Sequence, residues 1–148
     1  MRRDTWALGA VLAVVVVLPA VAQTGAQSDA VLLGRWRTPA QNGVVAIERC
    51  GDDLCAKVVD AAALRANPDQ RDVRNRDPAL RSRPVKGLMV LRAASGGPRV
   101  WTAGPLYDPD SGQGAATGTL TLIEPDRLAV RGCIARLLCR TQTWTRAR

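Results

Sequence analysis

Short runs of alternating apolar and polar residues recur along most of the chain, separated by turn-forming residues. In residues 116–123, for example, three threonines alternate with Leu120 and Leu122. Side chains that alternate in this way point to opposite faces of a β-strand, so that one face can be buried. We expect strands over residues 31–38, 44–50, 55–59, 87–93, 99–103, 106–107, 116–123, 128–133 and 139–146.

The links between these strands are mostly short and rich in Gly, Pro and Asp, as in Asp108-Pro-Asp-Ser-Gly112. Helical periodicity is confined to residues 61–66. Short strands joined mainly by hairpins are typical of an antiparallel barrel or sandwich. A tryptophan in the first strand, Trp36, and an Arg/Trp-containing last strand are suited to sealing a barrel seam. We therefore predict an all-β fold, an antiparallel up-and-down barrel of eight to nine strands with one long loop.

The first 22 residues have the pattern of a cleaved signal peptide. Arg2 and Arg3 precede an apolar run over 6–18, and Ala20-Val-Ala22 is a small-residue cleavage site. The run is shorter than the roughly 20 residues that a membrane-spanning helix needs, so we expect no transmembrane anchor. The mature chain, residues 23–148, has the length of a single domain.

Four cysteines in an exported chain without any histidine favour disulfides over a metal site. If Cys50 lies opposite Cys55 in a hairpin, Glu48 faces Lys57 on one side of the sheet and Ile47 faces Val58 on the other. Pairing Cys133 with Cys139 separates the faces of the last hairpin in the same way. We therefore predict two local disulfides, Cys50–Cys55 and Cys133–Cys139.

The last hairpin then has one face that carries Leu128, Val130 and Gly132 opposite Trp144, Gln142 and Arg140. If this face is interior, the barrel contains a guanidinium group, and an unpaired buried charge is very costly. We expect Arg140 to stack on Trp36.

Residues 60–86 interrupt the strand pattern with seven basic residues and four aspartates. A link of this length is usually functional or disordered. It is either a folded loop held by Asp–Arg pairs over one barrel end or a solvated excursion. The net charge of +8 is either a plain basic surface or an attraction to anionic envelope components. We expect no nucleic-acid partner for an exported protein, and the oligomeric state stays open.

The sequence offers little catalytic chemistry. Without histidine, triads based on Ser-His or Cys-His are excluded. The pairs Asp52/Asp53 and Asp108/Asp110 are expected to shape turns, and the second lacks the later Glu of a calcium loop. We predict no catalytic residue, no metal and no cofactor, with a hydrolase based on Asp and Arg residues as the remaining alternative.

Several motifs together are similar to one bacterial family, the domain of unknown function 2147. They include Gly34-x-Trp36-x-Thr-Pro39, Cys50-Gly-x-x-Leu-Cys55, Tyr107-Asp108-Pro109-x-Ser-Gly112 and the ending from Val130 to Arg146. The resemblance covers nearly the whole mature chain. It implies a periplasmic, lipocalin-like (calycin) β-barrel that holds a small, largely apolar ligand.

Three functions follow from these observations. The first is a carrier or sensor of a small apolar or amphiphilic molecule. The second is an envelope-interaction module that uses the basic loop and has a filled interior, and the third is the hydrolase. This chain departs from the family pattern at Ala56 and at 114–116, which leaves the ligand open. For the carrier, we predict a pocket lined by Trp36, Trp101, Tyr107, Val130 and Trp144, with Arg83, Arg140 or Gln142 at the polar head of the ligand.

Overall fold

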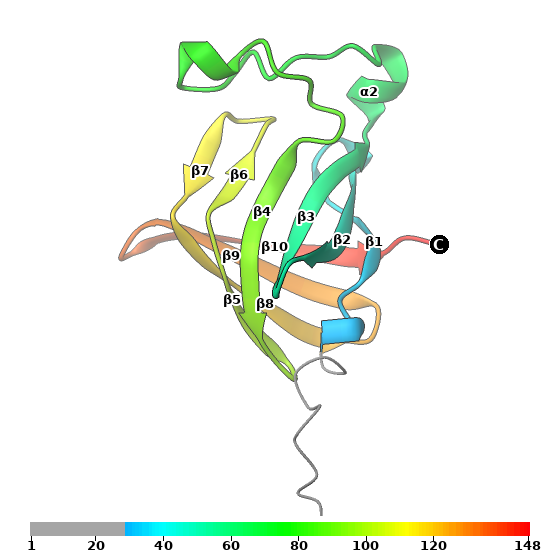
Figure 1. Cartoon of the computed structure of the whole chain (residues 1–148), viewed down its shortest axis with the longest axis vertical. Helices are drawn as coiled ribbons and strands as arrows, with labels where there is room; N and C mark the ends of the chain where they lie inside the picture. The colour runs from blue at the N-terminus through cyan, green and yellow to red at the C-terminus, as the bar shows by residue number, and fades with distance from the viewer. Residues whose placement is uncertain (1–28) are drawn as a thin grey trace, which may run out of the picture.

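Residues 29–148 are described by a computed structural model, and their antiparallel strands close into a barrel (Figure 1). The expected signal peptide, residues 1–22, lies outside the described residues. Within residues 29–148, no helix has the length and apolar character needed to span a membrane. The strands are β1 (Gly34–Arg37), β2 (Val44–Cys50), β3 (Asp53–Asp60), β4 (Met89–Gly96), β5 (Val100–Ala103), β6 (Leu106–Asp108), β7 (Gln113–Ala115), β8 (Thr117–Glu124), β9 (Arg127–Ala135) and β10 (Leu138–Arg146).

The predicted antiparallel barrel of eight to nine strands is confirmed, with eight strands of which two are each divided in two. The sheet runs in the order β3-β2-β1-β10-β9-β8-β5-β4-β6-β7, and an additional β3–β4 pairing closes it. Ala103 pairs with Gly118 and Leu106 with Ala115, so one register runs through β5–β8 and β6–β7. These four segments are therefore a single long hairpin with a bend in the middle.

Gly104 lies at this bend and has a positive φ of 156°. A Cβ atom there would lie 2.3 Å from the carbonyl oxygen of Ala116, which only glycine avoids. Both Gly104 and Pro105 still bond to Arg92 of β4, through Gly104 N to Arg92 O and Arg92 N to Pro105 O, each 3.1 Å. The bent hairpin thus stays attached to β4.

The edge of this hairpin that faces β9 separates from it. Pairing of β8 with β9 runs only as far as Thr117 opposite Cys133. Within the described chain, no strand pairing joins β7 to β9. The barrel is consequently open between the β6–β7 hairpin and the β9–β10 hairpin.

The opposite end of the barrel is packed shut around Trp36 and Trp101, which are fully buried. Trp36 Nε1 donates to Leu32 O at 2.7 Å, and Trp101 Nε1 donates to Asp29 Oδ1 at 2.8 Å. The strand expected over 31–38 therefore starts only at Gly34. The preceding residues turn across the barrel end, where they satisfy both indole N–H groups.

The seam between β1 and β10 is closed by a cation–π contact, as expected, but the arginine is a different one. The Arg146 guanidinium lies 4.0 Å from the Trp36 ring centroid and donates to the carbonyls of Val31 and Leu33. Trp36 and Arg146 are also direct cross-strand partners. The predicted Arg140–Trp36 stack is thus wrong, because Arg140 lies at the other end of the same face of β10.

The predicted register of the last hairpin is confirmed. Cys139 pairs with Cys133, Gln142 with Val130, and Trp144 with Leu128. The Cys133–Cys139 disulfide is formed. Leu128, Val130 and Trp144 are buried, so the predicted interior face is also correct.

The first disulfide, Cys50–Cys55, is formed as predicted, but its hairpin has a different register. Cys50 pairs with Asp53 and Glu48 with Cys55, because the turn contains two residues rather than four. A shift of two residues preserves which face each side chain occupies. Lys57 and Glu48 therefore still form an ion pair.

Residues 60–86 form a folded loop over the open end of the barrel (Figure 1). The loop contains α2 (Ala62–Ala66) and η2 (Pro78–Leu80), and a further 3-10 turn, η1 (Ala40–Asn42), precedes β2. Asp77 caps η2 by accepting from Ala79 N at 2.9 Å. An Asp60–Arg65 ion pair fixes the start of the loop, which agrees with the loop held by Asp–Arg pairs.

We predict that Arg146→Ala lowers the free energy of unfolding by about 2 kcal/mol, since it removes a cation–π contact and leaves two carbonyls without their donor. Arg146→Lys should recover only part of this loss, because an ammonium group cannot reproduce the planar fork. Urea unfolding followed by tryptophan fluorescence measures both. Arg148→Ala is the control, and an equal loss in that variant would contradict the role given to Arg146.

Candidate functional site

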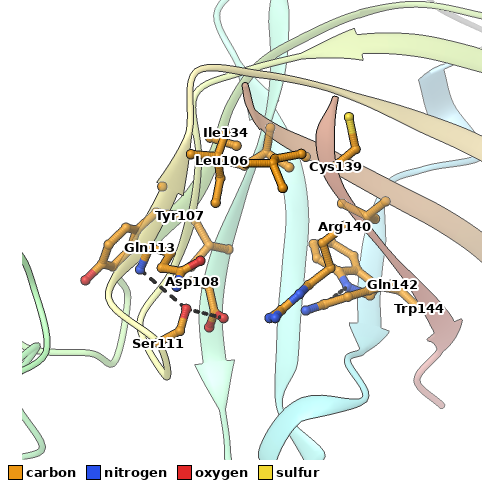
Figure 2. A pocket seen from close by; sticks show the side chains of 16 residues that line it. Leu106, Tyr107, Asp108, Ser111, Gln113, Ile134, Cys139, Arg140, Gln142 and Trp144 are labelled. Carbon is orange, nitrogen blue, oxygen red and sulfur yellow. Dashed lines mark hydrogen bonds between the residues drawn. The ribbon is translucent and has the colours of Figure 1, made fainter. Parts of the chain in front are cut away.

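A pocket of about 330 Å³ opens between the β6–β7 hairpin and the β9–β10 hairpin (Figure 2). Its lining combines apolar and polar side chains from β4, β6, β7, β9 and β10 and from the β6–β7 turn. The apolar lining consists of Val90, Leu106, Val130, Ile134, Leu138 and Trp144. The polar lining consists of Tyr107, Asp108, Ser111, Gln113, Arg140 and Gln142.

Alternate residues of β10 form one wall. Arg140, Gln142 and Trp144 share the inward face, and Trp144 Nε1 donates to Gln142 Oε1 at 3.3 Å. The Arg140 side chain points across the pocket opening (Figure 2). Within residues 29–148, no carboxylate forms an ion pair with Arg140. The pocket therefore carries a guanidinium group that points toward the Asp108 side but forms no ion pair there.

The β6–β7 turn forms the facing wall. Asp108 Oδ1 accepts from Asp110 N at 3.0 Å, and its Oδ2 accepts from Ser111 Oγ at 2.7 Å. Both carboxylate oxygens thus stabilise the turn, in agreement with the turn predicted here. Burial, together with the neighbouring Asp108 charge, raises the pKa of the Asp110 carboxyl, while Arg74 opposes the shift.

A buried carboxylate in the loop fixes the position of this wall. The Asp72 side chain is fully buried and pairs with Arg83 at 2.8 Å. It also accepts a 2.8 Å hydrogen bond from Asn75 Nδ2 and a 2.6 Å hydrogen bond from Tyr107 OH. The Arg83 guanidinium lies 5.1 Å from the Tyr107 ring centroid. Tyr107 belongs to β6, so this network ties the loop to the outer edge of the pocket.

The same loop also touches the turn itself. Arg74 donates to the carbonyl of Asp110, and a Cβ atom on Gly112 would lie 1.9 Å from Arg74 O. Gly112 has φ of 68°, which also favours glycine. A smaller hollow of about 90 Å³ lies beneath the loop and shares Gln142 and Trp144 with the main pocket.

The structure brings together most of the residues predicted for the site. Those that line the pocket are Tyr107, Val130, Arg140, Gln142 and Trp144. Trp36 and Trp101 do not line it, because they fill the closed end of the barrel. Arg83 does not line it either, since its guanidinium is bound to Asp72. The predicted lining is corrected at these three positions.

The prediction from sequence missed several lining residues. Ile134 continues the inward parity of Leu128, Val130 and Gly132, so extending the pattern by one step could have found it. From the sequence, Leu106 is expected only in a brief strand and Asp108 only in a turn. The Gly104-Pro105 dipeptide indicates a break before them, but it does not indicate that the chain continues into the pocket wall.

One group of possible metal ligands lies elsewhere in residues 29–148, formed by Glu48, Cys50 and Cys55. The two sulfur atoms are bonded to each other. A disulfide does not provide the thiolates that a metal would require.

An eight-stranded antiparallel barrel, closed at one end around a tryptophan and an arginine and open to a pocket at the other, is a lipocalin-like fold. The fold is similar to that of a solved structure described as "Protein HP1028 from the human pathogen Helicobacter pylori belongs to the lipocalin family". The TM-score is 0.67 at 19% identity, over 79% of this chain and 83% of that chain.

The chain belongs to the family described as "Uncharacterized protein conserved in bacteria (DUF2147)", which matches residues 34–146. The resemblance inferred from the sequence motifs is thereby confirmed. No curated protein sequence matches this chain.

Tyr107 is the only tyrosine of the protein, so tyrosinate absorbance reports on it alone. Burial, followed by its hydrogen bond to Asp72, raises its pKa from 10.0 to about 12. Because the folded-state pKa is the higher one, this group stabilises the fold fully below about pH 10 and loses that contribution as pH rises towards 12.

We predict an alkaline absorbance titration with a midpoint near 12 in the native protein. Asp72→Asn should lower the midpoint part of the way, because burial remains. The fully unfolded protein in urea provides the reference titration. A native midpoint equal to that reference would rule out the Asp72–Tyr107 network.

Proposed function

We propose that this protein binds a small apolar or amphiphilic molecule at the open end of its barrel and acts as a carrier or sensor rather than an enzyme. The observation that supports this function best is a pocket of about 330 Å³ with an apolar interior and an unpaired arginine at its rim. Ligand sites in proteins are typically mostly apolar with a few well-placed polar groups.

The size of the pocket limits the ligand. It is at the small end of the range of about 300–1,000 Å³ for ligand pockets. Trp36 and Trp101 fill the closed end, so only the open half of the barrel can receive an apolar group. This favours one short acyl chain or a compact ring system over a long lipid.

The polar groups at the rim favour an anionic or strongly accepting head. Arg140 and Gln142 supply donors on the β10 side, and no carboxylate in residues 29–148 forms an ion pair with Arg140. On the facing side, Asp108 already accepts two hydrogen bonds within its turn. We infer that the head group lies against β10 and away from Asp108.

The alternative of an envelope module based on the 60–86 loop has less support. Several of the arginines in this loop bind groups within the protein, as Arg65 does with Asp60 and Arg83 with Asp72. The hydrolase alternative has no support from the carboxylates, since Asp108 is used to build its turn. We propose the periplasm as the location, on the basis of the signal-peptide pattern over residues 1–22.

A bulky side chain on the pocket wall should prevent binding. We predict that Gln142→Trp, produced in the periplasm of a bacterial host, loses a bound small molecule that native mass spectrometry detects on the wild-type protein. Thr143→Trp is the matched control, because it adds the same ring to the exposed outer face one residue further along β10. If Gln142→Trp carried the same added mass as the wild type, the pocket would not be the binding site.

Arg140 should select for an anionic head. We predict that Arg140→Gln weakens binding of dodecanoate about tenfold, as expected for the loss of a charge-assisted hydrogen bond, and leaves binding of dodecanol nearly unchanged. Arg131→Gln removes an equal charge from the outer face of the adjacent strand and should leave both affinities as they are. Tryptophan fluorescence titration measures them. Equal losses for both ligands would exclude recognition of charge by Arg140.

A further inference from the structure

The tip of the β9–β10 hairpin exposes large aliphatic side chains to solvent. Leu137 is 96% exposed, Leu138 67% and Ile134 57%. The hairpin projects from one side of the barrel, to the left in Figure 1. An exposed cluster of apolar side chains usually marks an interaction surface. We call residues 134–138 the apolar tip.

The apolar tip is held in a fixed shape. The Cys133–Cys139 disulfide joins the two strands directly behind it, with the Cα atoms 4.0 Å apart. Beyond this bond, Leu138 still pairs with Ala135, so only Arg136 and Leu137 form the turn. Little backbone conformational entropy is therefore lost when the tip enters a partner surface.

The β9–β10 hairpin itself carries charge of one sign. From Arg127 to Arg146 it has five arginines and no acidic residue, and Arg127 and Arg146 lie at the end away from the tip. Arg136 lies within the tip and Arg140 just behind the disulfide. Basic residues beside apolar ones are attracted to anionic lipid headgroups, each contributing independently. Two copies of the tip meeting about a twofold axis would instead bring arginines together.

The apolar tip is continuous with the opening of the pocket. Ile134 and Leu138 belong to both, and Arg140 lies at the pocket rim. A surface that receives the tip therefore lies directly against the pocket opening.

We propose that the apolar tip docks on the surface of an anionic lipid bilayer. Leu137, Leu138 and Ile134 enter the headgroup region, while the Arg136 guanidinium remains at the level of the lipid phosphates. Long basic side chains keep their charge in water in this way while their methylene groups cover apolar surface. The proposal does not depend on the pocket being occupied.

The test uses the mature protein and sedimented vesicles of equimolar phosphatidylglycerol and phosphatidylcholine. Neither Leu137 nor Arg136 lines the pocket. We expect Leu137→Ser to weaken vesicle binding about fivefold or more, through loss of apolar insertion. Arg136→Gln should weaken it about fivefold, through loss of one basic group near the surface. Binding should fall with added salt and on vesicles of phosphatidylcholine alone.

The control substitutions lie on the 60–86 loop, which is the surface that the alternative envelope function would use. Val73 and Arg76 are both exposed on the 60–86 loop. Val73→Ser and Arg76→Gln repeat the two chemical changes there and should leave vesicle binding unchanged. All four variants should also keep the dodecanoate affinity of the wild type, so loss of vesicle binding and failure of the pocket proposal can be told apart.

Two results would overturn the proposal. The first is vesicle binding that is unaffected by the tip variants or is weakened equally by the loop variants. The second is concentration-dependent self-association without vesicles that Leu137→Ser abolishes, which would make a second copy of the chain the partner of the tip. Sedimentation equilibrium measures that association.

Discussion

The contact between Arg146 and Trp36 holds together the β1–β10 seam at the closed end of the barrel. The two residues are cross-strand partners at the β1–β10 seam, and the guanidinium also holds the carbonyls of Val31 and Leu33 across the barrel end. Trp36 and Trp101 are both fully buried. Because two large rings fill this end, the remaining strands need not converge at the other end. The core at the closed end of the barrel is therefore compatible with a pocket at the open end.

The open end of the barrel is stabilised by contacts that lie outside the pocket. The bend at Gly104 directs the outer half of the long hairpin away from β9, while bonds to Arg92 keep it on β4. Asp72 then fixes the outer edge through Tyr107. An ionised carboxylate is costly to bury unless it is paired and fully hydrogen-bonded, and Asp72 has Arg83, Asn75 and Tyr107 as partners. The loop over the barrel therefore supports the pocket wall from outside.

Local parity was sufficient to predict the fold class and the interior face of the last hairpin. It could not predict which arginine meets Trp36, because Arg140 and Arg146 share a face of β10 and only the β1–β10 register distinguishes them. The predicted register of the Cys50–Cys55 hairpin was wrong for a similar reason. Turns of two and four residues place the same side chains on the same faces, so the pattern of faces does not distinguish them. The pocket lining was predicted where it follows β9 and β10. It was missed where it depends on the bend at Gly104, which is set by close contact with Ala116.

The pocket and the apolar tip have the same cause. Both arise because β9 and β10 extend beyond the strands that pair with them on either side. The pairing of β9 with β8 stops at Thr117, the first residue of β8, so the outer part of β9 has no paired strand on that edge. Near the barrel the inward face of the hairpin borders a cavity, and further out Ile134 and Leu138 reach solvent. The same inward row carries Arg140, so an amphiphile at the tip would meet aliphatic contacts and then a cation without leaving β10. Without the outer part of β10, Trp144 would have neither the aliphatic side chains nor Arg140 beside it on this face. The length of this hairpin therefore places the proposed docking surface directly beside the proposed ligand pocket.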